Sequence, residues 1–381
     1  MRTATRLVWL EARRTPTRPI RAAVTLTVLA TLALVLITLL DTLEQRGTGL
    51  LRAVDADLVV FNEEARQQVL RSRVPRPATI GVGFVDGVHE VGVLSVVPST
   101  VTHDGEQLRS MLVGFNARTP AEPTRVLEGR VPTDGEPNIV AVDAALHRAG
   151  IDVGDRIVLG GSLEVEVVGV VAEAMFLQQP TVWAPPDVWA RTGARAFPER
   201  GYAEALVGIG LVQVQIGEDP AEVAPAIVAD LREEDLDVEV VALAEAIRAV
   251  PGASAIRVTF GSLVLLALVV IVVVSAGLAL LQVDRDRALH AELRALGAPP
   301  GLLSATLLLR LGVVWLLATT AATLLTASLA AAVPPAVPLA VRPITLAATA
   351  VMLALAIGVG GAVGLTRLRG VDPAELLGGR G

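Results

Sequence analysis

The chain has 381 residues, 52% of them hydrophobic, and its mean hydropathy of +0.59 is high for a soluble protein. Its net charge of −7 argues against nucleic acid as a partner. The absence of cysteine excludes disulfides and thiolate chemistry, and the absence of lysine excludes the usual Walker A loop, whose lysine contacts phosphate groups. Any ATP hydrolysis that powers this protein is therefore expected on a different polypeptide.

Four apolar segments are each about as long as the roughly 20 residues that cross a bilayer as a helix. A backbone in lipid has to satisfy its own hydrogen bonds, so we expect α-helices. The alternative for the first segment, a cleaved signal peptide, is disfavoured by its length and by the missing small-residue cleavage site. The predicted transmembrane helices cover residues 22–41, 258–283, 304–333 and 344–366.

Arginine placement predicts the orientation of these helices. Three segments rich in arginine, residues 1–21, 284–303 and 367–381, fall on one side of a four-span topology, whereas the loop 334–343 contains only Arg342. Basic segments stay in the cytoplasm. We therefore expect a multi-pass protein of the cell membrane (plasma or inner) with both termini cytoplasmic.

The segment 42–257 has ordinary globular composition, and we expect it outside the cell as an α+β domain of two lobes with a boundary near 192–205. Alternation around Gly160-Gly161-Ser162 predicts a β-hairpin of residues 156–159 and 163–171. Further strands are expected at 57–61, 91–97, 110–115, 211–216 and 238–241, and helices at 62–73, 143–149 and 220–231.

Catalytic motifs are not found in the sequence. The histidines His89, His103, His147 and His290 are scattered without ligand spacing, and there is no nucleophile elbow. Acidic pairs such as Glu63-Glu64 are typical of a solvated surface. We therefore expect no catalytic, cofactor-binding or metal-binding residue in this chain, which disfavours a membrane-anchored enzyme.

The loop 284–303 has the pattern of a short amphipathic helix. Leu289, Leu293 and Leu296 share one face, while Arg294 lies off it, and Gly297 followed by two prolines ends the helix. One interpretation is an interfacial helix among lipid headgroups. The other is a docking helix that fits a groove on a soluble partner. The pattern alone leaves both open.

Several motifs together resemble the FtsX/MacB-type ABC transporter permeases. The stretch Arg294-Ala-Leu-Gly-Ala298 resembles their cytoplasmic loop, and Leu112-Val-Gly-Phe-Asn116 is similar to the four-span DevC-like branch, which exports lipids or related amphiphiles. The motifs keep the family's order along nearly the whole chain. One departure is Leu289-His-Ala291, where the family commonly has Glu-Ile-Gly. Other similar segments are Arg13-Arg14, 128–132, 153–155, 165–171 and 371–377.

The resemblance implies a permease subunit that works as a homodimer with two ABC ATPase subunits, which bind the ATP and magnesium. It implies export or mechanotransmission. The alternative is an FtsX-like membrane regulator of an extracytoplasmic partner such as a cell-wall hydrolase. The ATPase-coupling residues would be Leu289, Leu293, Arg294, Leu296 and Gly297.

Gly360 and Gly364 of the last span form a pair of small residues four positions apart. Small residues let helices approach closely in lipid. The pair predicts tight helix packing, either inside one subunit or between two copies.

Overall fold

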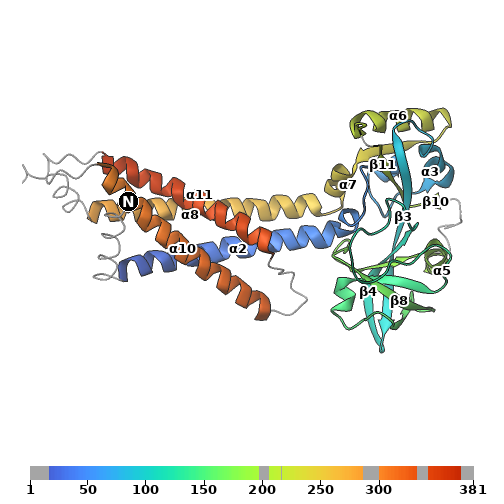
Figure 1. Cartoon of the computed structure of the whole chain (residues 1–381), viewed down its shortest axis with the longest axis horizontal. Helices are drawn as coiled ribbons and strands as arrows, with labels where there is room; N and C mark the ends of the chain where they lie inside the picture. The colour runs from blue at the N-terminus through green and yellow to red at the C-terminus, as the bar shows by residue number, and fades with distance from the viewer. Residues whose placement is uncertain (1–16, 197–205, 216, 286–299, 333–341, 370–381) are drawn as a thin grey trace, which may run out of the picture. The chain divides into compact units, whose positions relative to one another are not determined.

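The computed structural model describes residues 17–196, 206–215, 217–285, 300–332 and 342–369 (Figure 1). The chain divides into two compact units, one of residues 43–256 and one of residues 1–42 together with 257–381.

The second of these units is helical. It contains most of α2 (Thr17–Arg52) and α8 (Ala253–Arg285), and all of α10 (Pro300–Ala332) and α11 (Pro343–Arg369). Each of these four helices is long and apolar enough to cross a membrane. The sequence-based expectation of four apolar helices is confirmed. Helix α2 extends beyond the predicted span, because its last residues, 43–52, belong to the other unit.

The helical unit is apolar inside and outside. All four helices contribute to one core of mostly small side chains, including Ala30, Ile271, Ala318 and Ala356. Large aliphatic side chains also cover the outward surfaces, with Leu265 63% and Leu355 65% exposed. Helices that face lipid have this distribution, whereas water would oppose it.

The unit 43–256 is built on a ten-stranded mixed sheet, ordered β12-β1-β11-β3-β4-β9-β6-β8-β5 with β7 pairing β3 and β8. The strands are β1 (Leu58–Asn62), β3 (Val88–His103), β4 (Glu106–Phe115), β5 (Val126–Gly129), β6 (Ile139–Asp143), β7 (Arg156–Leu159), β8 (Leu163–Val171), β9 (Thr181–Ala184), β11 (Ile209–Val214) and β12 (Val238–Ala242). Strands β2 (Val74–Pro75) and β10 (Leu206–Val207) form a separate pair.

The helices of this unit are α3 (Arg76–Val82), α4 (Ala144–His147), α5 (Pro186–Ala196), α6 (Pro220–Glu233) and α7 (Leu243–Ala249). In Figure 1, α3 and α6 lie beside the β11 end of the sheet and α5 beside the β4 and β8 end. The predicted β7–β8 hairpin is confirmed by its antiparallel register, with Ile157 opposite Val165.

The predicted helix at 62–73 is wrong. Only a single 3-10 turn, η1 (Glu63–Ala65), forms, and Arg66 (φ 49°) and Gln67 (φ 60°) then adopt left-handed conformations that end it. The Asn62 side chain accepts a hydrogen bond from the backbone N–H of Arg73 at 2.8 Å. This side-chain contact fixes a closed loop in place of a helix.

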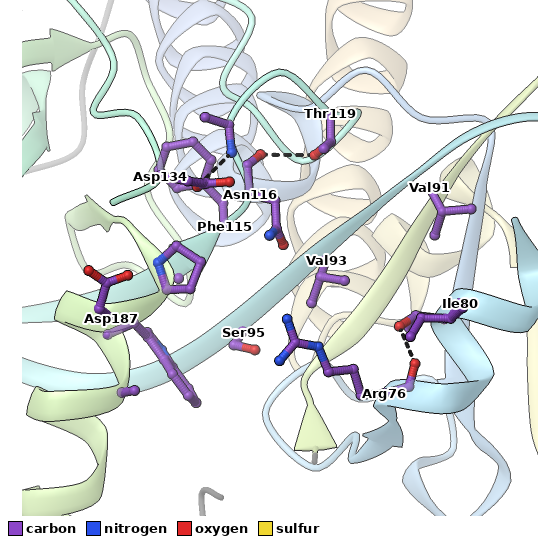
Figure 2. Close-up of a pocket in the computed structure, with 16 residues that line it drawn as sticks. Arg76, Ile80, Val91, Val93, Ser95, Phe115, Asn116, Thr119, Asp134 and Asp187 are labelled. Atoms are coloured by element: carbon purple, nitrogen blue, oxygen red, sulfur yellow. Dashed lines mark hydrogen bonds between the residues drawn. The ribbon is translucent and has the colours of Figure 1, made fainter. Parts of the chain in front are cut away.

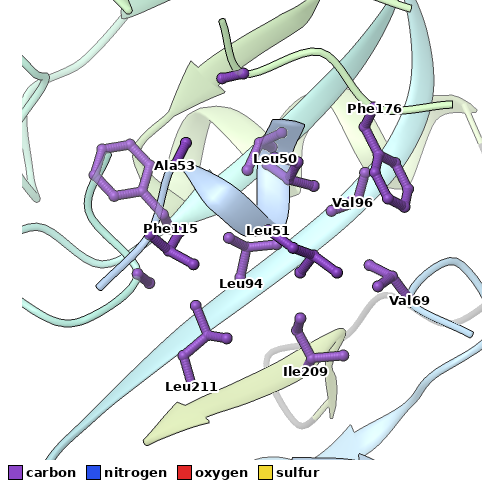
Figure 3. Close-up of a cluster of buried hydrophobic side chains, with 14 of the residues drawn as sticks. Leu50, Leu51, Ala53, Val69, Leu94, Val96, Phe115, Phe176, Ile209 and Leu211 are labelled. Carbon is purple, nitrogen blue, oxygen red and sulfur yellow. The ribbon is translucent and has the colours of Figure 1, made fainter. Parts of the chain in front are cut away.

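The unit 43–256 has three apolar cores, which pack against its sheet. One end is packed by residues between 58 and 88 and between 212 and 238, and the other by residues between 97 and 189. The third, here termed the central core, packs the opposite face of the sheet, because alternate residues of one strand, such as Val59 and Leu58, belong to it and to an end core (Figure 3). The end core of residues 58–88 and 212–238 therefore takes residues from both sides of the expected 192–205 boundary, whereas the other end core lies wholly before it. Residues 197–205 lie outside the described part.

Candidate functional site

The predicted ATPase-coupling residues Leu289, Leu293, Arg294, Leu296 and Gly297 all lie in 286–299, outside the described residues. Their role stays a prediction. The helix-packing pair Gly360 and Gly364 lies in α11.

At Gly360, α11 approaches α8 of the same chain. A Cβ built on Gly360 would lie 2.7 Å from the carbonyl oxygen of Val272 and 2.8 Å from the backbone nitrogen of Ala276, and it would overlap the hydroxyl of Ser275. By contrast, a Cβ on Gly358 would meet nothing within 4 Å. The close approach at Gly360 therefore requires a residue without a side chain.

The end of α2 lies in the central core of the sheet-containing unit. Leu50 and Leu51 are fully buried, and Figure 3 shows them beside Leu94 and Val96 of β3. Burying two leucines contributes about 1.5–3 kcal/mol each. Ala253, the first residue of α8, belongs to the same core. The C-terminal end of α2 and the N-terminal end of α8 are therefore both packed in the core of this unit.

Residues 173–179, here termed the strap, connect β8 to β9 and close over the end of α2. The backbone N–H of Leu50 donates to the carbonyl of Met175 at 3.0 Å. The backbone N–H groups of Leu177 and Gln178 donate to the carbonyls of Gly47 and Arg46 at 3.1 and 2.9 Å. Two of these bonds are donated to carbonyl groups of α2 and one is accepted from an N–H group of α2, so the strap is bonded to the main chain of the helix.

Gly49 allows this approach. A Cβ at position 49 would lie 2.5 Å from the carbonyl oxygen of Glu173 and 2.9 Å from that of Met175. A Cβ at Gly47 would meet only the Gln178 amide nitrogen, at an ordinary 3.6 Å. Of these two helical glycines, Gly49 is the one that the contact requires.

Asp143, at the end of β6, is hydrogen-bonded to the start of the strap. Its side chain is 1% exposed and accepts hydrogen bonds from the backbone N–H groups of Ala145 and Ala174, both at 2.7 Å. Burial raises the pKa of Asp143, and these two N–H donors oppose the rise. Thr181 donates to the carbonyl of Ala174 at 3.1 Å, and Trp183 donates to the Thr181 hydroxyl at 2.9 Å. A buried polar network therefore fixes the start of the strap.

A cavity of about 670 Å³ lies between α3 and α5 (Figure 2). Its polar groups include Arg76 on one wall and Asp187 on the other. Gly114, in the middle of the motif 112–116, is needed here because a Cβ would lie 2.5 Å from Cγ of Trp189. The apolar lining includes Ile80, Val91, Val93, Phe115 and Trp189.

Within the described ranges, no group of three or more histidine or acidic side chains is placed to hold a metal ion. Nδ1 of His147 lies 2.9 Å from a carboxylate oxygen of Asp152, and Nε2 of His103 lies 3.6 Å from one of Asp155. Both histidines are at least partly exposed.

Sequence reasoning missed Gly49, the strap and Asp143. Two signals were present: the glycines 47 and 49 at the end of an apolar helix, and an aspartate after a buried strand in the N-cap position before Ala144. Neither signal identifies the partner segment, which is more than a hundred residues away in the chain from α2.

The chain is similar to one family model and to several solved structures. The family model for the MacB-like periplasmic core domain matches residues 22–233, more than half of the chain. The periplasmic region of MacB from Actinobacillus actinomycetemcomitans is similar with a TM-score of 0.40 and 12% identity, over 51% of this chain and 92% of that one.

The extracellular domain of YknZ, a noncanonic ABC-type transporter from Gram-positive bacteria, is similar with a TM-score of 0.37 and 18% identity, over 49% of this chain and 98% of that one. A domain of a permease protein from Porphyromonas gingivalis gives 0.35 and 15%, over 49% and 88%. No curated protein matches the chain.

Proposed function

Because the chain belongs to the FtsX/MacB-type family of ABC transporter permeases, we propose that it transmits motion from a separate ATPase subunit to an extracytoplasmic domain. One observation carries the proposal. Helix α2 runs without interruption from Thr17 to Arg52, and its last residues, 43–52, belong to the unit 43–256, whose core includes Leu50 and Leu51. A displacement of α2 therefore acts on that core directly.

The length of α2 supports this role. Its 36 residues correspond to about 54 Å at 1.5 Å per residue, more than the roughly 30 Å of the hydrocarbon layer. Such a helix crosses the layer and still reaches into the domain beyond it. An uninterrupted helix moves as a stiff rod because its hydrogen bonds have to break before it bends sharply.

The permease acts as a homodimer in the cell membrane with two ATPase subunits that hold ATP and magnesium. The coupling loop, with Leu289, Leu293, Arg294, Leu296 and Gly297, docks on the ATPase. Transmission of motion is common to an exporter and to a regulator of an external partner. Turnover that depends on a transported substrate would identify the exporter, and turnover that depends on an external protein would identify the regulator.

We expect a subunit with a Walker A lysine to co-purify with the affinity-tagged chain from its own host. After reconstitution in lipid, ATP should change the distance between spin labels in the two copies. The labels are attached to a cysteine that replaces Arg125, an exposed residue of the unit 43–256. Pulsed electron paramagnetic resonance measures that distance. A chain that co-purifies with no nucleotide-binding subunit would refute the proposal.

The orientation is tested separately, and the cysteine-free chain makes single labels unambiguous. Single cysteines in place of Arg125 and Arg232 should react with an impermeant maleimide on intact cells. Cysteines at His290 and Gly381 should react only after the cells are permeabilised. Labelling of position 290 from outside would exclude the four-span topology with cytoplasmic termini.

A further inference from the structure

The strap has an unfavourable backbone shape that its surroundings maintain. Glu173 (φ 47°), Leu177 (φ 49°) and Gln178 (φ 65°) are all left-handed although none is glycine. Residues with side chains keep such conformations only where other contacts determine them, and these conformations cluster at functional segments. The backbone of the strap is hydrogen-bonded to α2, to Asp143 and, between Phe176 and Gln179, to itself.

The two sets of contacts join different parts of the molecule. On one side, the strap bonds the main chain of α2 at residues 46, 47 and 50. On the other, the backbone N–H of Ala174 bonds the carboxylate of Asp143 on β6. Strand β6 lies between β8 and β9, the two strands that the strap connects. A displacement of α2 is therefore transmitted to three neighbouring strands through one segment.

We propose that the strap is the grip through which α2 moves the β6–β8–β9 part of the outer domain, and that Asp143 is the positioning residue that holds the grip closed. This proposal rests on the proposed function, in which α2 carries the motion. The grip stays closed throughout the ATP cycle. Leu50 and Leu51 share a core with Ala141, Val171 and Trp183 of these strands, and in this proposal that packing is not sufficient to move them without the strap.

Two glycines on the same helix provide a matched test. Gly49→Ala places a Cβ 2.5 Å from the carbonyl oxygen of Glu173, so the strap has to move away. Gly47→Ala makes the same chemical change where the nearest atom is 3.6 Å away. Both changes raise helix propensity equally, so a difference between them reports on the strap.

The first measurement is hydrogen exchange on the full-length protein in lipid nanodiscs without nucleotide. In Gly49→Ala, the amides of Leu50, Leu177 and Gln178 should exchange roughly tenfold faster or more, because their bonds join α2 to the strap. Gly47→Ala should match the wild type. Equal exchange in the two variants would overturn the grip.

Asp143→Asn tests the positioning residue. An asparagine oxygen replaces one acceptor, and asparagine still caps α4, but its NH2 group cannot accept the second N–H. The amides of Ala174 and Ala145 then compete for a single oxygen, so the hydrogen exchange of one of them should rise. ATP-driven displacement of the domain should fall, although Asp143 lies outside α2. Unchanged displacement would show that Asp143 is only a structural residue.

The second measurement is the ATP-driven distance change between labelled domains, together with ATP turnover. Gly49→Ala should keep turnover and lose most of the displacement, whereas Gly47→Ala should keep both. A covalent cross-link between the strap and α2 should restore the displacement in Gly49→Ala. The Gln45 amide donates to the Glu173 carboxylate at 3.2 Å at the surface, so cysteines at these two positions accept a short bifunctional thiol reagent.

Cross-linking the strap to α2 should restore displacement in Gly49→Ala and leave the otherwise wild-type protein active. A purely structural defect would not be rescued this way, and a cross-link that stops the wild-type cycle would overturn a permanently closed grip. Absence of any ATP-driven displacement in the wild type would count against the proposed function, whereas the exchange contrast between the two glycine variants decides the grip independently.

Discussion

Replacing Leu293 with glutamate is expected to release the ATPase subunit from the permease. Apolar side chains at the centre of an interface cost about 1–3 kcal/mol when truncated, and a charge that is buried without a partner costs more. A loss of about 3 kcal/mol weakens binding more than a hundredfold. Insertion into the membrane should be unchanged because the predicted loop 284–303 lies outside the hydrocarbon layer.

The measurement is co-purification of the ATPase with wild-type and variant protein, followed by ATP turnover in lipid. Ala291→Glu serves as the control, because helical periodicity places residue 291 opposite the leucine face. The control should retain the ATPase. If Leu293→Glu also retains it with normal turnover, the loop is an interfacial helix and the docking interpretation fails.

Local pattern was enough to predict much of the sheet. Strands β1, β11 and β12 and the β7–β8 hairpin follow from alternating apolar residues and from turn residues. The longest pairing, β3 with β4, was predicted only as two short strands. Its turn, Asp104-Gly105, has positive φ at both residues, so an Asp-Gly signal that predicts a tight hairpin was present in the sequence.

Apolar composition predicted the four helices but not where the first one ends. Residues 43–52 contain polar and glycine positions, which made residue 42 a plausible boundary of the span. The helix continues because Leu50 and Leu51 are buried in the core of the unit 43–256 and because the strap bonds the backbone of α2 at residues 46, 47 and 50. These contacts come from segments far away in the chain, and tertiary packing of this kind overrides local propensity.

The glycine pair in α11 illustrates the same limit for the site. The spacing of Gly360 and Gly364 predicts a close helix contact but cannot identify the other helix. The structure brings α8 of the same chain against Gly360. Gly358, two positions earlier on the same helix, has open space. The two positions therefore predict opposite effects for one substitution.

Gly360→Ala is expected to lower the stability of the helical unit by roughly 1–3 kcal/mol, the usual cost of overpacking a tight contact. The added methyl group would overlap the Ser275 hydroxyl and the α8 backbone, and backbone cannot rotate away as a side chain can. Helix propensity favours alanine by only about 0.5–1 kcal/mol, so the steric term decides the sign.

Gly358→Ala has the propensity gain without the overlap, so it should leave stability unchanged or raise it. Thermal unfolding of both variants in lipid, with the oligomeric state measured at the same time, separates the alternatives. Lower stability of Gly360→Ala at an unchanged oligomeric state indicates packing within one subunit. Overpacking of a contact between two copies would instead dissociate the dimer. If both variants unfold like the wild type, the α8–α11 approach at Gly360 is not tight, and the steric explanation for a glycine at position 360 fails.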